Sequence, residues 1–346
     1  MMSKLICLMP TYNKEKTLAK AIESVMMQKT DYSYKLIILD DCSTDNSNKI
    51  AHEYRNKYPN KIEIVRNEEN LKLLKTITKG YSLLKGADYF CVLDADDWYI
   101  YDKKFDDAIK FLEKNKDFSM YMTNINLMKK DSATLWINTK DEYKDFNIDE
   151  YHSGKGFFVQ TTGVIYRNIY FKYGMNEKFI QATYGKYGEL LRADGFRHEW
   201  YLHGGKAHFV NHVESIYNWN EEGIYASLVQ GEQNLLNTKL YLAFADFFEN
   251  KQEYYLNKAR NLYNSTMISF AKLEKEKYSK CIKDIVDLHI ELFIKNPTEQ
   301  KEQPIVHTKD KYSLLEQIFS IKNSKDEKHK VITILGIKIK FWRIYA

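Results

Sequence analysis

An acidic run, Asp94-Ala95-Asp96-Asp97, follows directly after an apolar stretch of the sequence. Residues i and i+2 of an extended chain point to the same side, so Asp94 and Asp96 can face one ligand. Two carboxylates held that close repel each other, and a bound divalent cation removes the repulsion. Oxygen ligands of this kind suit Mg²⁺ or Mn²⁺, which also take substrate phosphates as ligands. The alternative interpretation is an acidic start to the next helix, with Asp97 favouring its N-terminus.

Two further polar clusters follow apolar runs, namely Pro10-Thr11-Tyr12-Asn13 and the segment from Asp40 and Asp41 to residue 45. A carboxylate in such a place can accept a hydrogen bond from the N–H of a nucleobase or from a ribose hydroxyl. The ring of Tyr12 can stack on a flat base. The alternative is that both clusters are turns, with residues 40–45 capping a helix and Tyr12 lying in the core.

The elements that must position these clusters alternate between strand and helix. Apolar runs predict strands at residues 5–9, 35–39, 62–65 and 89–93, and helical periodicity predicts helices at 14–28, 46–58 and 71–85. Gly86 is predicted to end the third helix. Such alternation predicts a parallel sheet with helices on both faces, whose ligands bind beyond the carboxyl ends of the strands. We therefore expect the three polar clusters to converge.

The three clusters together, in this order and at this spacing, resemble the motifs of the family 2 glycosyltransferases of the GT-A fold. The resemblance extends over residues 3–220 and is most specific in the first hundred. It implies an α/β fold, a mostly parallel sheet flanked by helices, and inverting transfer of a sugar from a nucleotide-diphosphate sugar, with UDP-sugars favoured. It also implies a glycan or lipid-linked glycan acceptor, as in bacterial capsule or lipooligosaccharide synthesis.

The same resemblance assigns roles to individual residues. The residues matching the nucleotide-binding positions are Pro10, Tyr12, Asn13, Asp40, Asp41 and Asp94. The pair Asp94 and Asp96 matches the D-x-D motif, which implies Mn²⁺ or Mg²⁺ as cofactor, and Asp97 is an alternative metal ligand. The sequence departs from the family where Lys72, Ile77 and Thr78 replace the usual Gly, Arg and Asn. Lys72, Lys75 or Lys79 can supply the missing positive charge, although a solvated helix face is the preferred interpretation.

The catalytic base is expected at Asp194, because inversion needs one carboxylate to take the proton of the acceptor hydroxyl. Family members often carry Glu-Asp about ten residues before a Gly that precedes a strand, and here Ala193-Asp194 stands in that relation to Gly204. Ala193 departs from the usual Glu. Glu199 is the second choice for the base. The alternative role for Asp194 is to cap a helix over residues 195–203.

Three other functions are compatible with parts of the sequence. His198 and His203 suggest a zinc hydrolase, but their i, i+5 spacing places the second histidine off the face that an i, i+4 pair shares. A non-catalytic nucleotide-binding domain is disfavoured by the intact Asp94 and Asp96 pair. Sugar transfer directly to polyprenyl phosphate is a further alternative.

Composition narrows the class of protein and its location. The chain has 346 residues, and 44% are hydrophobic, which is too many for intrinsic disorder. The net charge is +5 with both signs spread along the chain, which is not the basic stripe of a nucleic-acid binder. There is no run of 18 apolar residues and no signal-peptide core. We expect a cytoplasmic protein, free or peripherally attached to the inner membrane.

We expect three segments: the GT-A domain at residues 1–220, a helical extension at 221–330 and a basic, apolar tail at 331–346. The end of the extension, residues 296–330, is polar and predicts a loop. In the tail, Leu335-Gly336 can turn a hairpin. The tail can pack on the helical region or pair between subunits of a homo-oligomer, which we prefer, or its basic and apolar residues can touch an anionic membrane. An apolar cluster within residues 254–263 is predicted to pack beside the sheet or on another subunit.

Overall fold

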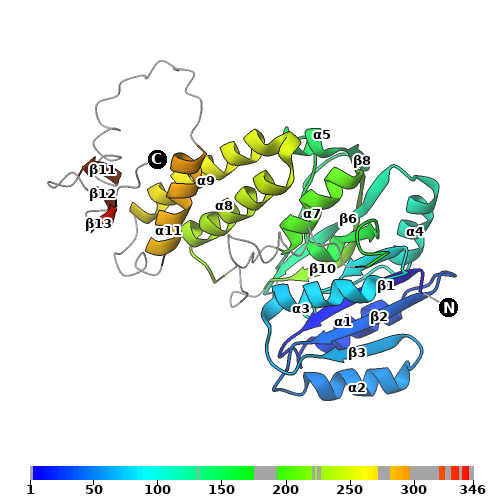
Figure 1. The fold of residues 1–346 in the computed structure, drawn as a ribbon. Coiled ribbons are helices and arrows are strands. Elements are labelled where there is room, and N and C mark those ends of the chain that lie inside the picture. Colours follow the sequence, from blue (N-terminus) through cyan, green and yellow to red (C-terminus); the bar gives the residue numbers. More distant parts are fainter. Residues whose placement is uncertain are drawn as a thin grey trace. The chain divides into compact units, whose positions relative to one another are not determined.

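The computed structural model describes residues 3–130, 132–174, 193–219, 223, 227–271, 281–296, 319–323, 329–334 and 337–342. The chain divides into two compact units, Met1–Ser227 and Leu228–Ala346. We describe each unit by itself (Figure 1).

The first unit is built on one mixed sheet, which contains ten of the described strands in the order β3-β2-β1-β4-β9-β6-β10-β5. Two of these strands lie off this path, β7 beside β6 and β8 beside β10. The strands are β1 (Leu5–Thr11), β2 (Tyr34–Asp40), β3 (Ile62–Arg66), β4 (Tyr89–Val92), β5 (Trp98–Tyr99), β6 (Phe118–Lys129), β7 (Ser132–Leu135), β8 (Tyr143–Phe146), β9 (Val164–Arg167) and β10 (Lys206–Asn218). The four strands predicted in the first ninety-three residues are all present.

Strand direction determines where the polar clusters meet. Strands β1, β2, β3 and β4 pair in parallel, and β9 pairs antiparallel with both β4 and β6. Two antiparallel steps restore the direction, so β6 runs with β4, and β10 is parallel to β6. The carboxyl ends of β1, β2, β4, β6 and β10 therefore open at the same edge of the sheet. In open sheets with this connectivity, ligands bind at that edge.

Helices cover both faces of the parallel part of the sheet (Figure 1). They are α1 (Leu18–Met26), α2 (Ser47–Lys57), α3 (Lys72–Tyr81), α4 (Lys104–Lys114), α5 (Ile148–His152) and α7 (Ala193–Gly204), with 3₁₀ turns at Ser82–Leu84 and Thr161–Gly163. On one face, Cys7 and Ile38 join a core with residues of α1 and α4. On the other face, the backbone of α3 approaches so closely that a Cβ on Gly80 would lie 2.5 Å from Leu39 Cδ1. Because both faces are covered, the strands are continuous apolar runs rather than alternating ones.

Gly86 has a φ of 85°, as its predicted role in ending the third helical segment requires. The four cysteines are free thiols; Cys7, Cys91 and Cys281 are buried, and Cys42 is half-buried.

The second unit contains a helical part and a small sheet. The helices are α8 (Gln230–Phe247), α9 (Gln252–Ala271) and α11 (Ile282–His289), with a 3₁₀ turn at Glu249–Lys251 and a π-helical turn at Ile290–Lys295. Tyr255 and Tyr263 are buried, and the ring centroids of Tyr255 and Phe244 are 5.3 Å apart. Part of the 254–263 cluster therefore packs inside its own unit. No helix in the described part of the chain has the length and apolarity that a membrane crossing requires.

The small sheet has the order β11-β12-β13, with β11 (Phe319–Asn323), β12 (His329–Ile334) and β13 (Ile337–Trp342). Strands β12 and β13 pair antiparallel with Ile334 opposite Ile337, which confirms the predicted hairpin. The turn residues Leu335 and Gly336 lie outside the described residues. The loop predicted at 296–330 is wrong for Phe319–Asn323, which pairs with β12 although its sequence is partly polar.

A buried ion pair joins three elements of the first unit. Lys104 Nζ, at the start of α4, lies 3.2 Å from Glu214 Oε2 of β10, and their side chains are 0% and 2% exposed. The same ammonium group donates a hydrogen bond of 2.6 Å to Thr123 Oγ1 of β6. Removing one partner of a buried pair leaves a charge with neither water nor a counter-charge, whereas removing both avoids that cost.

We therefore predict that Lys104→Met lowers the free energy of unfolding by about 3–5 kcal/mol. The double variant Lys104→Met/Glu214→Leu should recover most of that loss, because no buried charge remains. Urea denaturation followed by tryptophan fluorescence measures both effects. Equal destabilisation in the single and double variants would show that the charge pair is not the cause.

Candidate active site

The acidic run 94–97 forms a tight turn at the carboxyl end of β4. The N–H of Asp97 donates to the carbonyl of Asp94 over 2.9 Å, and Thr17 Oγ1 fixes the turn by donating to the carbonyl of Ala95 over 2.9 Å. Asp94 and Asp96 are half-buried, and Asp97 is buried. Asp97 Oδ1 accepts the N–H of Asn218, which follows directly on Tyr217 at the end of β10. Asp97 thus joins two strand ends, and Asp94 and Asp96 remain the more exposed carboxylates of the turn.

The turn is electrostatically strained. Burial raises the pKa of Asp94 to about 7, with the nearby charge of Asp96 adding to the rise and Arg197 opposing it. Burial and the charges of Asp96 and Asp94 also raise the pKa of Asp97 well above its usual range. Asp96 has its own partner, because Lys14 Nζ lies 2.5 Å from its Oδ2. Cationic groups therefore offset part of the repulsion that the sequence predicted.

The residues of this turn suit a divalent cation that is shared with a ligand. Within the described ranges, no group of three or more His, Cys, Asp or Glu side chains is placed to hold a metal. Asp94 and Asp96 offer two carboxylates whose repulsion a cation would relieve. Mg²⁺ typically binds through one or two carboxylates together with substrate phosphates and water. The donor set fits a metal–diphosphate unit better than a metal held by protein alone.

The neighbouring acids Asp40 and Asp41 have different surroundings. Asp40 is buried, and its carboxylate accepts hydrogen bonds from the N–H of Ser43 at 3.0 Å and from Asn48 Nδ2 at 3.0 Å, and pairs with Arg66. These contacts hold the loop after β2. The carboxylate of Asp41 accepts fewer hydrogen bonds. Among the described residues, its side chain accepts hydrogen bonds only at Oδ1, from Asn67 Nδ2 and the N–H of Leu71, each at 2.8 Å.

The loop after β1 is tied to the loop after β2. Asn13, with a φ of 52°, donates its N–H to Ser43 Oγ over 3.1 Å and accepts the N–H of Thr44 over 2.8 Å. Pro10 is buried within β1. Tyr12 is 42% exposed, so its ring is free to contact a flat ligand. Tyr12 and Asn13 are both exposed, but Asn13 is bonded to the loop after β2, so Tyr12 offers the open ring while Pro10 and Asn13 shape the backbone.

The three lysines considered for the missing arginine lie on α3. All are exposed, as a solvated helix face predicts. Lys79 Nζ donates to Asn67 Oδ1 over 2.8 Å, and Asn67 in turn holds Asp41. The cation that the structure places on the acidic turn is Lys14, which the sequence did not single out. Its only signal was its position next to the Tyr12-Asn13 cluster.

Asp194 lies in the first turn of α7, where its Oδ1 accepts the N–H of Gly195 over 2.7 Å. Its charge raises the pKa of Asp94, and it also acts on Tyr217 together with Asp97, Asp94 and Asp96. The start of α7 is therefore within electrostatic reach of the acidic turn. Glu199, the second choice for the base, is buried and paired with His152 of α5.

Arg197 is a buried cation that the sequence analysis missed. It lies three residues after Asp194 on α7, and is 2% exposed. Nη1 donates to the Tyr81 hydroxyl over 2.7 Å and Nη2 to Thr161 Oγ1 over 3.1 Å. Its charge opposes the rise in the pKa of Asp94. An arginine among the apolar residues of α7 was the available signal.

His198, from the rejected zinc hypothesis, and the later His208 lie in separate aromatic surroundings. The His198 ring is 4.9 Å from that of Tyr151 and 5.1 Å from that of Phe158. The His208 ring stacks 3.9 Å from Phe111.

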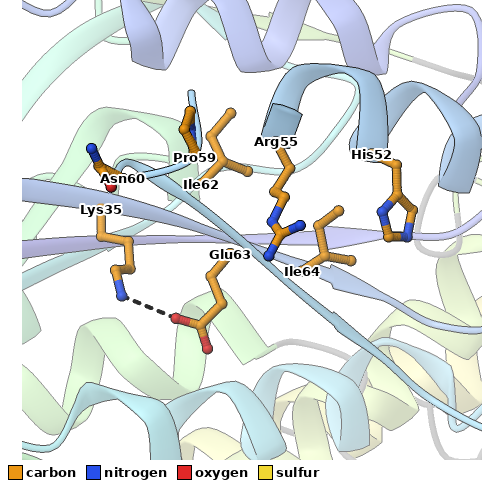
Figure 2. A pocket seen from close by; sticks show the side chains of 8 residues that line it. All are labelled: Lys35, His52, Arg55, Pro59, Asn60, Ile62, Glu63 and Ile64. Carbon is orange, nitrogen blue, oxygen red and sulfur yellow. Dashed lines mark hydrogen bonds and ion pairs between the residues drawn. The ribbon is translucent and has the colours of Figure 1, made fainter. Parts of the chain in front are cut away.

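A pocket elsewhere in the first unit is lined from α2, β2 and β3 (Figure 2). In Figure 2, Lys35 reaches toward Glu63 and the two form an ion pair of 3.0 Å, with Arg55 and His52 along the wall. Lys35 stands near the start of β2, whereas the predicted site residues follow strand ends. None of those predicted residues lines this pocket.

Comparison with known proteins agrees with this geometry. Residues 6–176 match the family described as Glycosyl transferase family 2. An uncharacterised protein of Mycobacterium tuberculosis is 22% identical over 66% of this chain and 62% of its own length. The putative glycosyltransferase EpsE of Bacillus subtilis is 32% identical over 35% of this chain and 43% of its own. The chain thus spans about 62% of the length of the mycobacterial relative.

Among solved structures, residues 1–349 of Staphylococcus aureus TarS, in complex with UDP-GlcNAc, superpose with a TM-score of 0.59 at 15% identity, covering 99% of this chain and 100% of that one. This likeness shows the fold, which is GT-A with C-terminal helices. The N-terminal part of the chain, residues 6–176, is a glycosyl transferase family 2 domain.

Proposed function

We propose that this protein transfers a sugar from a nucleotide-diphosphate sugar, with inversion, to a hydroxyl group of a glycan acceptor. The observations that support the proposal are the acidic turn with Asp94 and Asp96 at the carboxyl end of β4 in a family 2 domain, and the charge of Asp194 acting on Asp94. Asp94 and Asp96 suit the binding of a diphosphate and its cation, and Asp194 can act as the proton acceptor. UDP-sugars are the first donors to test, because the TarS structure holds UDP-GlcNAc.

On the donor side, the exposed ring of Tyr12 stacks on the base, and Asp41 accepts a hydrogen bond through the oxygen that its described partners leave unused. Asp94 and Asp96 would hold Mn²⁺ or Mg²⁺, which supplies positive charge to the diphosphate leaving group. Lys14 lies 2.5 Å from Asp96 and adds a second positive charge at the same place. These residues bind and orient the donor.

On the acceptor side, we assign the base to Asp194. The acceptor oxygen attacks the anomeric carbon while the bond from that carbon to the diphosphate breaks, and the diphosphate leaves with the bonding electrons. Asp194 takes the proton of the acceptor hydroxyl as the new bond forms. The buried Arg197 lies one helical turn from it and holds Tyr81 and Thr161.

The pathway is proposed from the relatives. Two Bacillus subtilis proteins, TuaG at 31% identity and GgaB at 32%, are named for teichuronic acid and minor teichoic acid biosynthesis. We propose assembly of a bacterial cell-surface polysaccharide, such as a capsule or lipooligosaccharide, from an acceptor that is a free or lipid-linked glycan. Lipid-linked acceptors place the reaction at a membrane surface, where the basic tail can take part.

We predict that Mn²⁺ tightens the binding of UDP by about tenfold or more, because the cation joins the carboxylates to the diphosphate. Asp96→Asn should abolish this gain. Its affinity for UDP in EDTA should match the wild type or exceed it, since Lys14 Nζ is released toward the diphosphate. Isothermal titration calorimetry with UDP and with uridine, in Mn²⁺ and in EDTA, measures these affinities.

Uridine lacks the diphosphate and should show no gain from Mn²⁺. Asp102→Asn is the matched control. Asp102 lies outside the acidic turn and pairs with Lys29 at 2.6 Å, so this variant should bind UDP like the wild type. Equal affinity of the wild type for UDP in Mn²⁺ and in EDTA would contradict the assignment of the metal to Asp94 and Asp96.

We also predict that Asp194→Asn lowers turnover by roughly a hundredfold or more, the usual contribution of a general base. The affinity for UDP and the melting temperature should stay close to those of the wild type, because an amide oxygen can replace Asp194 Oδ1 as the acceptor of the N–H of Gly195. Release of UDP from a donor in the presence of acceptor measures turnover.

Glu199→Gln distinguishes the two candidate bases. It breaks a buried pair with His152, so it should lower the melting temperature and leave the turnover of the folded protein largely intact. An inactive but folded Glu199→Gln variant, together with an active Asp194→Asn variant, would reverse the assignment.

A further inference from the structure

Three aromatic side chains lie together at the carboxyl edge of the sheet: Trp136 in the loop after β7, Tyr217 at the end of β10 and Trp219 just beyond it. The ring centroids of Trp136 and Tyr217 are 5.9 Å apart at 79°, and those of Tyr217 and Trp219 are 6.1 Å apart at 78°. All three residues are half-buried rather than part of the closed core. We call these three residues the aromatic platform.

The backbone fixes the platform rigidly. The N–H of Trp136 donates to the carbonyl of Ile125 over 3.0 Å, and its indole Nε1 donates to the carbonyl of Phe158 over 2.9 Å. The N–H of Trp219 donates to the carbonyl of Met128 over 2.8 Å. Rings held in this way lose little conformational entropy when a ligand binds.

The platform adjoins the acidic turn. Asn218, between Tyr217 and Trp219, donates its N–H to Asp97 Oδ1 over 2.9 Å. The charges of Asp97, Asp94, Asp194 and Asp96 all act on the Tyr217 hydroxyl. The rings are therefore placed within reach of a ligand bound at the carboxylates.

The order of strands separates the platform from the nucleotide side. Tyr12 and Asp41 follow β1 and β2, and the acidic turn follows β4. The platform follows β7, which pairs with β6, and the end of β10, on the other side of β4. A donor that spans from Tyr12 to the acidic turn occupies the first part of this edge. The space at the platform is left for the molecule that receives the sugar.

One polar group of the platform is unsatisfied. The indole Nε1 of Trp219 is shielded from solvent and has no hydrogen-bond partner in the described part of the chain. A buried donor without an acceptor costs free energy, and a ligand hydroxyl or ring oxygen would remove that cost. Aromatic rings with a few polar groups are the usual lining of a small-molecule site.

We propose that the aromatic platform binds a pyranose ring of the acceptor glycan, with the C–H face of the sugar against the rings and a sugar oxygen on Trp219 Nε1. The inference rests on the proposed function and adds the part of the acceptor that is recognised. It distinguishes an acceptor that ends in a sugar ring from one that ends in an open-chain polyol, which offers no flat apolar face.

The test uses the full chain saturated with UDP, and cellobiose, N,N′-diacetylchitobiose and glucitol as probes. Saturation-transfer NMR and tryptophan fluorescence measure the binding of each. At least one disaccharide should bind, and glucitol should bind more weakly. Trp136→Ala should weaken disaccharide binding by about tenfold, the scale of one ring-stacking contact, and Trp136→Phe should restore most of it. Trp219→Phe should weaken binding also, because it removes the indole donor.

Tyr143→Ala is the matched control. Tyr143 is 66% exposed on β8 and pairs with Val210, at the other end of β10, so this variant should bind the disaccharides like the wild type. UDP affinity, measured in every variant, should stay within about threefold of the wild type, since the platform does not touch the nucleotide side.

The inference is overturned if no disaccharide binds the UDP-loaded wild type, if glucitol binds as tightly as the disaccharides, or if Trp136→Ala and Trp219→Phe both bind like the wild type. Failure of the wild type to bind UDP at all contradicts the proposed function instead. The two failures are therefore distinguishable in one set of titrations.

Discussion

Electrostatic repulsion at one edge of the sheet is the constraint on which the rest of this domain depends. The carboxylates that gather there are those of Asp94, Asp96, Asp97 and Asp194. Lys14 pairs with Asp96, and the buried Arg197 opposes the rise in the pKa of Asp94. Asp97 is hydrogen-bonded to the backbone of β10. The pKa of Asp94 is still raised to about 7, chiefly by burial, and the charges of Asp96 and Asp194 add to the rise. The part due to these charges is free energy that a cationic ligand can recover when it binds.

The loops on the nucleotide side are held in unfavourable backbone conformations. Asn13, Cys42 and Lys72 have φ values of 52°, 62° and 70°, in the left-handed region that non-glycine residues seldom adopt. Hydrogen bonds compensate: Asn13 is bonded to Ser43 and Thr44, and the N–H of Lys72 donates to Asn70 Oδ1 over 3.0 Å. Strain that is fixed by neighbouring contacts is typical of loops shaped for a ligand.

The sequence was sufficient for features made of contiguous residues. The strands before Asp41 and Asp94 were predicted, because an apolar run buried on both faces is a strong local signal. The sequence was insufficient where the role of a residue depends on a contact partner elsewhere in the chain. Asp40 and Asp41 are neighbours in sequence, and they differ in that Asp40 contacts Ser43, Asn48 and Arg66. Arg197 was missed for the same reason. The strand Phe319–Asn323 escaped prediction because its pairing with β12, not its polar sequence, stabilises it.

The same contrast between contiguous motifs and distant contacts applies to the two proposed substrate sites. The residues proposed to bind the nucleotide lie in short loops that directly follow β1, β2 and β4. Each group is contiguous in the sequence and can therefore be recognised as a motif. The aromatic platform brings Trp136 beside Tyr217 through the pairing of β6 with β7 and β10. Nothing in either segment alone marks it as part of a site. In this chain, the proposed donor side is therefore easier to find from sequence than the proposed acceptor side, because the latter depends on strand pairing between distant segments.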